Sequence, residues 1–121
     1  LGVKCLAGNY TDSKIDSKTV ICDSEWYSIV TAQKGFKCFE ISATVSSDDG
    51  NSAIQGKTLF ADGHWENELL SIPKPRELFP HKNQLELRWR KKSNGYDLQI
   101  RTHAELKGKP LINYKLTKIL I

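Results

Sequence analysis

The sequence lacks several features that would assign a function directly. It has no apolar run approaching the roughly 20 residues that a membrane-spanning helix needs, so we expect no membrane partner. Its three histidines, His64, His81 and His103, are scattered, and no Cys-x-x-Cys pair occurs. Structural zinc sites need closely spaced ligands of these types, and the glycine-rich loops that hold phosphates are also missing. We therefore expect neither a metal nor a cofactor.

Methionine is absent and cysteine is scarce. Because the chain begins at Leu1 and has no methionine, we expect that its original start has been removed, either with a signal peptide or by design of the chain, and we favour a secreted protein. The three cysteines, Cys5, Cys22 and Cys38, allow one disulfide and one leftover thiol. The glycosylation sequon Asn9-Tyr10-Thr11 also suits an exported protein. A chain of 121 residues is the usual size of one domain, so we predict a single domain over residues 1–121.

The segment Asp12 to Phe36 has the spacing of an amphipathic helix. Asp16 or Ser17 can cap its first turn, and Lys34-Gly35 supplies a basic last turn and a stop. The residues that would form its buried face recur at steps of three and four: Ile15, Thr19, Cys22, Trp26, Ile29 and Val30. The β-branched stretch Thr19-Val20-Ile21 would also suit a short strand.

The rest of the chain has the alternation and turn signals of antiparallel strands. We predict strands at the following segments: Phe36 to Val45, Lys57 to Ala61, His64 to Ile72, the two arms of a hairpin over Gln84 to His103, and Leu111 to Ile121. Asp62-Gly63 and Asn94-Gly95 suit tight hairpin turns, whereas Ser46 to Gly56 and the proline-containing Pro73 to Lys82 are predicted loops. The expected fold class is α+β, with one N-terminal helix packed on an antiparallel β-sheet.

The predicted hairpin places basic residues together on one face of the sheet. A two-residue turn at Asn94-Gly95 would pair Trp89 with Ile100 on the buried side and Arg88 with Arg101 on the other side. The predicted binding residues are Arg88, Arg90, Lys92, Arg101 and His103. Such a face is either a cradle that binds phosphate or the acidic surface of another protein, or simply a solvated sheet face.

Catalysis would require more than positive charge. Cleavage of RNA through a cyclic phosphate needs a base, an acid and a group that stabilises the phosphorane. Glu68 or Glu66, His103 and Arg88 are the candidates for these roles. A lone histidine at the end of a strand is more often incidental, so we expect a protein that is not an enzyme.

This layout resembles the ribonuclease-like secreted effectors of powdery mildew fungi, which are related in fold to fungal guanyl-specific ribonucleases. The resemblance covers most of the chain. It depends on four segments: Val3-Lys4-Cys5, the helix that follows, Phe36 to Val45 after Gly35, and Leu85 to Ile100 with its Asn94-Gly95-Tyr96-Asp97-Leu98-Gln99-Ile100 turn and strand. Glu68 is followed by Leu69-Leu70 where the ribonuclease relatives have Phe-Pro, so the catalytic set is incomplete.

The resemblance implies an avirulence or virulence effector with a ribonuclease-like pseudoenzyme scaffold. Such a protein is delivered into the cytoplasm of the host plant cell, where it binds host protein or RNA. Some members are recognised directly by an intracellular leucine-rich-repeat immune receptor (NLR). We expect a monomer with no cofactor. The C-terminal strand has no cysteine where these effectors close their termini, so Cys5 would pair with Cys22 or Cys38, or remain free.

A third interpretation is a galectin-like β-sandwich that binds sugars. It is suggested by Trp65-Glu66 before Phe79-Pro80 and by the later Asn94-Gly95 turn. This interpretation predicts no helix, because Ser17 to Lys34 would then be strand and loop. The presence or absence of that helix therefore separates it from the effector and ribonuclease interpretations.

Overall fold

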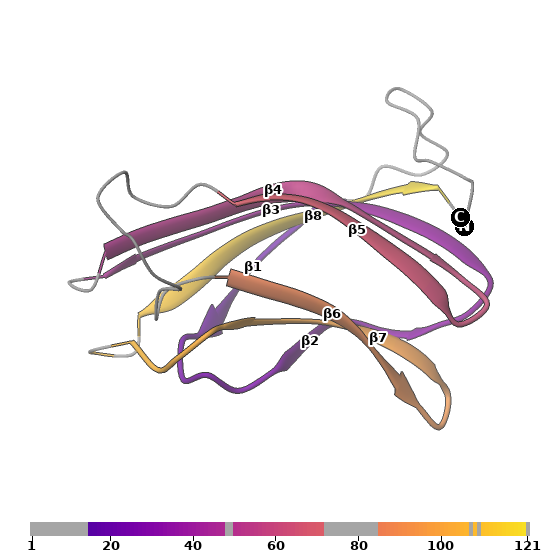
Figure 1. The fold of residues 1–121 in the computed structure, drawn as a ribbon, viewed down its shortest axis with the longest axis horizontal. Coiled ribbons are helices and arrows are strands. Elements are labelled where there is room, and N and C mark those ends of the chain that lie inside the picture. Colours follow the sequence, from indigo (N-terminus) through magenta and orange to yellow (C-terminus); the bar gives the residue numbers. More distant parts are fainter. Residues whose placement is uncertain (1–14, 48–49, 72–84, 107, 109, 121) are drawn as a thin grey trace.

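The computed structural model is a sandwich of two antiparallel β-sheets (Figure 1). It describes residues 15–47, 50–71, 85–106, 108 and 110–120. This described part contains no helix, and hence none that could cross a membrane. The predicted α+β fold with an N-terminal helix is therefore wrong, and the chain is all-β over these residues.

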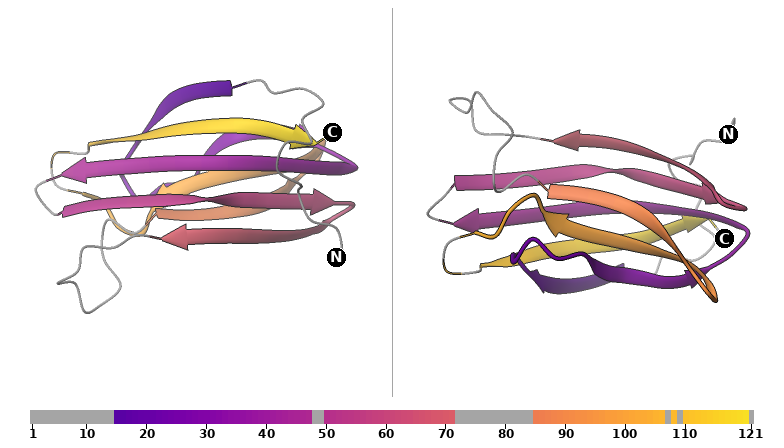
Figure 2. Two further views of the ribbon diagram at one scale, coloured as in Figure 1. Left: turned by 90° about the horizontal axis from the view of Figure 1, so that it is seen from above. Right: turned by 60° about the horizontal axis from the view of Figure 1, so that its bottom comes forward.

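The larger sheet has five strands and the smaller has three. The larger sheet contains, in spatial order, β1 (Ile15–Ile21), β8 (Leu111–Leu120), β3 (Phe36–Ser47), β4 (Gly50–Ala61) and β5 (His64–Ser71). The smaller sheet contains β2 (Tyr27–Gln33), β7 (Gly95–Thr102) and β6 (Leu85–Lys92). Seen from above, the strands of the larger sheet lie side by side over the smaller one (Figure 2). Each sheet therefore has one face toward the core and one outer face.

Alternation along the strands decides which face each residue takes. On β3, Ile41, Ala43 and Val45 are buried, whereas Ser42 and Thr44 between them are exposed. Successive side chains of a strand point to opposite faces of the sheet, so the apolar residues reach the space between the sheets. The polar ones are left on the outer face, where a ligand can reach them.

The core is built around Trp89 of β6. Its ring stacks on Phe60 of β4, with centroids 4.9 Å apart, and lies 6.2 Å from the ring of Phe39 on β3. Its indole nitrogen donates a hydrogen bond of 2.6 Å to the hydroxyl of Thr58, which donates in turn to Asn67 of β5. Trp89 is 3% exposed, so its predicted interior position is confirmed.

The predicted helix over Asp12 to Phe36 is replaced, from Ile15 onward, by β1, a connection and β2. The connection contains Ser24 with a positive φ of 66° and an isolated bridge from Asp23 to Glu105. The β-branched residues within this segment favour extended backbone. Strand β2 also contains two register shifts where it pairs with β7. These irregularities disturb the two-residue alternation, which is why the apolar spacing of the segment resembles that of a helix.

The predicted hairpin is confirmed as β6 and β7, but its turn and register are shifted. Lys92 pairs with Gly95, so the turn residues are Ser93 and Asn94 rather than Asn94 and Gly95. Gly95 instead lies against β2, because a Cβ there would be only 2.9 Å from the carbonyl carbon of Ala32. The glycine therefore serves close strand packing. The shift moves each pair by two positions, so every residue keeps its predicted face.

Other predicted elements have mixed outcomes. The hairpin around Asp62-Gly63 is confirmed, with positive φ at both residues, and so are the strands that became β3 and β8. The predicted loop Ser46 to Gly56 is wrong, since β3 extends to Ser47 and β4 begins at Gly50. The predicted loop Pro73 to Lys82 lies outside the described residues.

Removing the Thr58 hydroxyl tests the contact that joins the two sheets. In Thr58→Val, a side chain of similar shape leaves the buried Trp89 N–H without its acceptor, which costs roughly 1–3 kcal/mol. We expect the free energy of unfolding in urea to fall by that amount. Thr44→Val, on the exposed face of β3, is the matched control and should change it by less than about 0.5 kcal/mol. Equal unfolding midpoints for the two variants would contradict the importance of this hydrogen bond.

Candidate functional site

The residues predicted to cleave RNA are on opposite sides of the sandwich. Glu68 is on β5 and lines the outer face of the larger sheet, and the alternative Glu66 is on the same strand. Arg88 is on β6 and His103 directly follows β7, both in the smaller sheet. Packed sheets are separated by about 10 Å of side chains, whereas acid-base catalysis needs its groups within reach of one substrate. The structure therefore does not assemble the predicted triad.

The residues predicted to bind a partner do share a surface. Arg88, Arg90 and Lys92 alternate along β6 on the side opposite Trp89. Arg101 follows on the neighbouring β7, and His103 lies beyond its end. The outer face of the smaller sheet is therefore basic, as the alternation predicted.

The shifted register gives the two arginines partners that were not predicted. Arg101 lies opposite Glu86, and its Nε is 2.9 Å from a carboxylate oxygen of that residue. The same oxygen is 3.5 Å from Nδ1 of His103. Arg88 lies opposite Gln99 and donates from Nε to its side-chain oxygen at 2.8 Å. The predicted repulsive pairing of Arg88 with Arg101 is therefore wrong.

Both guanidinium groups also stack on one tryptophan. The guanidinium carbon of Arg88 is 4.1 Å from the centroid of the Trp26 ring, and that of Arg101 is 4.4 Å from it. Such cation–π contacts contribute about 0.5–1 kcal/mol each at exposed sites. We call Trp26, Glu86, Arg88 and Arg101 the arginine cluster. Trp26 was predicted to lie on the buried face of a helix, so its contact with the two arginines was not predicted.

A partly buried hydrogen-bond network supports the arginine cluster. Gln99, only 5% exposed, accepts from Arg88 and donates from its amide to the hydroxyl of Ser28 at 3.1 Å. Ser28 donates to Asp97, whose other carboxylate oxygen accepts from the backbone N–H of Ala32 at 3.1 Å. Ala32 has a positive φ of 55° within the irregular β2. This network fixes the edge strand and orients the Arg88 side chain.

The positive charge at this face is not fully compensated. Partial burial, followed by the charges of Arg90 and Arg101, lowers the pKa of Arg88 from its ordinary value. Arginine remains protonated at neutral pH even so. Because Arg90 and Arg101 lie close enough to contribute to this lowering after burial, a negative group brought to this face would be attracted to it.

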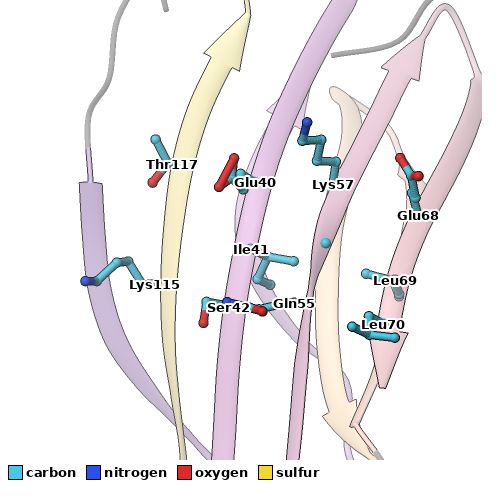
Figure 3. Close-up of a pocket in the computed structure, with 11 residues that line it drawn as sticks. Glu40, Ile41, Ser42, Gln55, Lys57, Glu68, Leu69, Leu70, Lys115 and Thr117 are labelled. Carbon is cyan, nitrogen blue, oxygen red and sulfur yellow. The ribbon is translucent and has the colours of Figure 1, made fainter. Parts of the chain in front are cut away.

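A groove of about 740 Å³ crosses the outer face of the larger sheet (Figure 3). We call it the sheet groove. Two cross-strand rows of side chains line it. The first row is Thr117, Glu40, Lys57 and Glu68, and the second is Lys115, Ser42, Gln55 and Leu70. Each row takes one residue from each of β8, β3, β4 and β5, so the four strands jointly hold the groove.

Gly56 fixes the spacing of the groove at β5. A Cβ at this position would lie 2.0 Å from the carbonyl oxygen of Glu68 and 2.9 Å from Cα of Leu69. Only glycine therefore allows β5 to approach β4 at this point. The groove is bounded there by Leu69 and Leu70, which are 37% and 62% exposed. Leu70, which continues the row of Gln55 on the outer face, gives one end of an otherwise polar groove an apolar surface (Figure 3).

The sheet groove offers many hydrogen-bonding groups and no net charge. Glu40 and Glu68 are balanced by Lys57 and Lys115. Carboxylates accept hydrogen bonds, lysine donates them, and the amide of Gln55 does both. Among the residues that the structure describes, no group of three or more His, Cys, Asp or Glu side chains could hold a metal ion. The groove therefore suits an uncharged polar ligand.

The cysteines differ in state. Cys38 is disulfide-bonded, whereas Cys22 is a free thiol that is completely buried. Cys5, predicted to pair with one of them, lies outside the described residues. Burial, and to a lesser extent the charge of Asp23, raises the pKa of Cys22 to about 11 against a smaller opposite effect of a hydrogen bond with Thr102. A buried thiol of this kind is inert, so Cys22 is a core residue.

Comparison with protein-family models, with curated protein sequences and with solved structures finds no match to this chain.

The state of Cys22 predicts its reactivity. Because the thiolate is the reactive form and Cys22 is both buried and of raised pKa, iodoacetamide at pH 8 should leave it unmodified in the folded protein. Addition of denaturant should expose it and allow rapid alkylation, measured by mass spectrometry. Cys38 should be alkylated only when a reductant is also present. Alkylation of Cys22 at equal rates with and without denaturant would contradict its buried position.

Proposed function

We propose that this protein is a non-enzymatic sugar-binding module that holds a neutral saccharide in the sheet groove. The observation that carries this proposal is the pair of polar rows contributed by four paired strands, with one exposed apolar boundary. Ligand sites of small molecules commonly have volumes of about 300–1,000 Å³, and the groove falls within that range. An all-β sandwich is also the fold that the galectin-like interpretation expected.

The chemistry of the groove matches that of a polyol. Each hydroxyl of a sugar can donate one hydrogen bond and accept others, as protein hydroxyls do. Glu40, Gln55 and Glu68 supply acceptors, while Lys115 and Gln55 supply donors. The apolar C–H surface of a sugar ring can pack on Leu70, which is 62% exposed. One ligand can therefore make polar and apolar contacts at the same time.

The charge balance favours a neutral sugar over an acidic one. Two carboxylates and two ammonium groups line the groove, so no single sign of charge dominates. Specificity then depends on where donors and acceptors lie. Neighbouring strands are about 4.8 Å apart and same-face residues on one strand about 7 Å apart. Because both spacings are fixed by backbone pairing, the polar groups are held in place before the ligand arrives.

Replacing Glu68 tests the groove. Glu68→Gln keeps the shape of the side chain but removes its charge, and a hydrogen bond to a charged group contributes about 1.5–3 kcal/mol. We expect at least a tenfold loss of affinity, measured by calorimetry with neutral oligosaccharides that bind the wild-type protein on a glycan array. Glu66→Gln, two residues away on β5 and outside the groove, is the matched control and should bind normally.

Two outcomes would overturn the proposal. One is an array on which the folded protein binds no neutral glycan. The other is equal affinity of the Glu66→Gln and Glu68→Gln variants for a glycan that the wild-type protein does bind. Circular dichroism of each variant would establish that both fold as the wild type does.

A second candidate is the secreted effector that binds a host plant protein. The shared basic face of Arg88, Arg90 and Arg101 supports it, since the same residues were predicted to contact a partner. Its ribonuclease-like scaffold is not retained, because the residues that the structure describes from Ile15 onward form strands and contain no helix. Co-expression with a panel of plant leucine-rich-repeat receptors should give a complex and cell death. If no receptor of the panel forms a complex or causes cell death, the proposal that an immune receptor recognises this protein is wrong.

A further inference from the structure

We propose that the arginine cluster is a separate binding site for a tetrahedral oxyanion, a sulfate or phosphate group, with Arg88 as its principal ligand. The site is on the smaller sheet, away from the sheet groove, so the inference does not depend on sugar binding. Three features carry it: the free end of the Arg88 guanidinium, the rigid support beneath it, and the second guanidinium nearby.

The donors of Arg88 are divided between the protein and solvent. Nε is used by Gln99. Within the described residues, neither terminal nitrogen donates to a protein acceptor, and no carboxylate forms an ion pair with Arg88. The two terminal nitrogens form a planar fork that matches two oxygens of an oxyanion. The terminal nitrogens of Arg88 are therefore available to bind an anion.

The support beneath Arg88 makes this fork rigid. Gln99 is 5% exposed and is held in turn by Ser28, while the ring of Trp26 stacks on the guanidinium at 4.1 Å. A flexible arginine would otherwise lose side-chain entropy when it became ordered on binding. Because Arg88 is already ordered by these contacts, this loss of entropy does not weaken the binding of an anion.

Arg101 adds a second positive group at short range. Its guanidinium carbon is 4.4 Å from the Trp26 centroid, so it lies at most 8.5 Å from that of Arg88, the sum of the two distances. Glu86 occupies its Nε and balances one positive charge. Asp97 lies directly across from Arg90, whereas Arg88 lies across from the neutral Gln99, so Arg88 is the arginine whose charge a bound anion would balance. A tetrahedral oxyanion has further oxygens that can face Arg101 while two of them bind the fork of Arg88, whereas a carboxylate has only two oxygens.

Titration with inorganic sulfate and inorganic phosphate tests the site, followed by nuclear magnetic resonance of the indole and guanidinium N–H groups. We expect saturable shifts at Trp26 and Arg88, whereas chloride at equal ionic strength gives none. Arg88→Lys keeps the charge but removes the fork and should weaken binding at least tenfold. Arg90→Lys, an exposed arginine on the same strand and face, is the matched control and should bind normally.

The comparison of sulfate with phosphate shows which kind of ligand carries the anion that binds this site. Tighter binding of sulfate points to a sulfated ligand and tighter binding of phosphate to a phosphorylated one, and either result supports the site. Trp26→Leu provides a second variant, which should weaken binding severalfold because the guanidinium loses its stacking partner. Shifts that rise linearly without saturation in the wild-type protein, or equal affinity in Arg88→Lys and Arg90→Lys, would overturn the proposal.

Discussion

The placement of both outer surfaces depends on how Trp89 is held between the two sheets. Its ring packs on Phe60 while its N–H donates to Thr58, so β6 is fixed on β4 by an apolar contact and a directional one together. A buried N–H without an acceptor would cost about 1–3 kcal/mol, which penalises any slip of the strand. Alternation along β6 then directs Arg88 outward. The continuation of the hydrogen bond from Thr58 to Asn67 of β5 directs the neighbouring Glu68 to the other outer face.

Local signals in the sequence were sufficient for the hairpins. The alternation of Leu85, Leu87 and Trp89 predicted that the basic residues lie on one face. That prediction is correct although the predicted register is wrong, because each residue's partner differs from the predicted one by two positions. The error itself has a tertiary cause. Gly95 looked like a turn residue, but it is needed where the backbone of β2 approaches β7. A contact between segments more than 60 positions apart cannot be predicted from the order of neighbouring residues in the sequence.

The N-terminal error and the missed groove have the same origin. The segment from Ile15 to Val30 carries apolar residues at helical spacing because one strand, a connection and an irregular strand follow one another there. The groove was missed because its rows run across strands. Glu40, Lys57 and Glu68 meet only through the pairing of β3 with β4 and of β4 with β5. The alternating polar positions of β3 were visible in the sequence, but their neighbours on β8 were not predictable from it.

The two surfaces differ in charge as well as in position. The sheet groove contains equal numbers of positive and negative side chains, whereas the arginine cluster and its neighbour Arg90 carry an excess of positive charge. Part of the net charge of +4 is therefore concentrated on one side of the sandwich. Long-range attraction would bring an acidic partner to the smaller sheet first, while short-range hydrogen bonds govern the groove. Because the packed core lies between them, a group bound on one face would not block the other face.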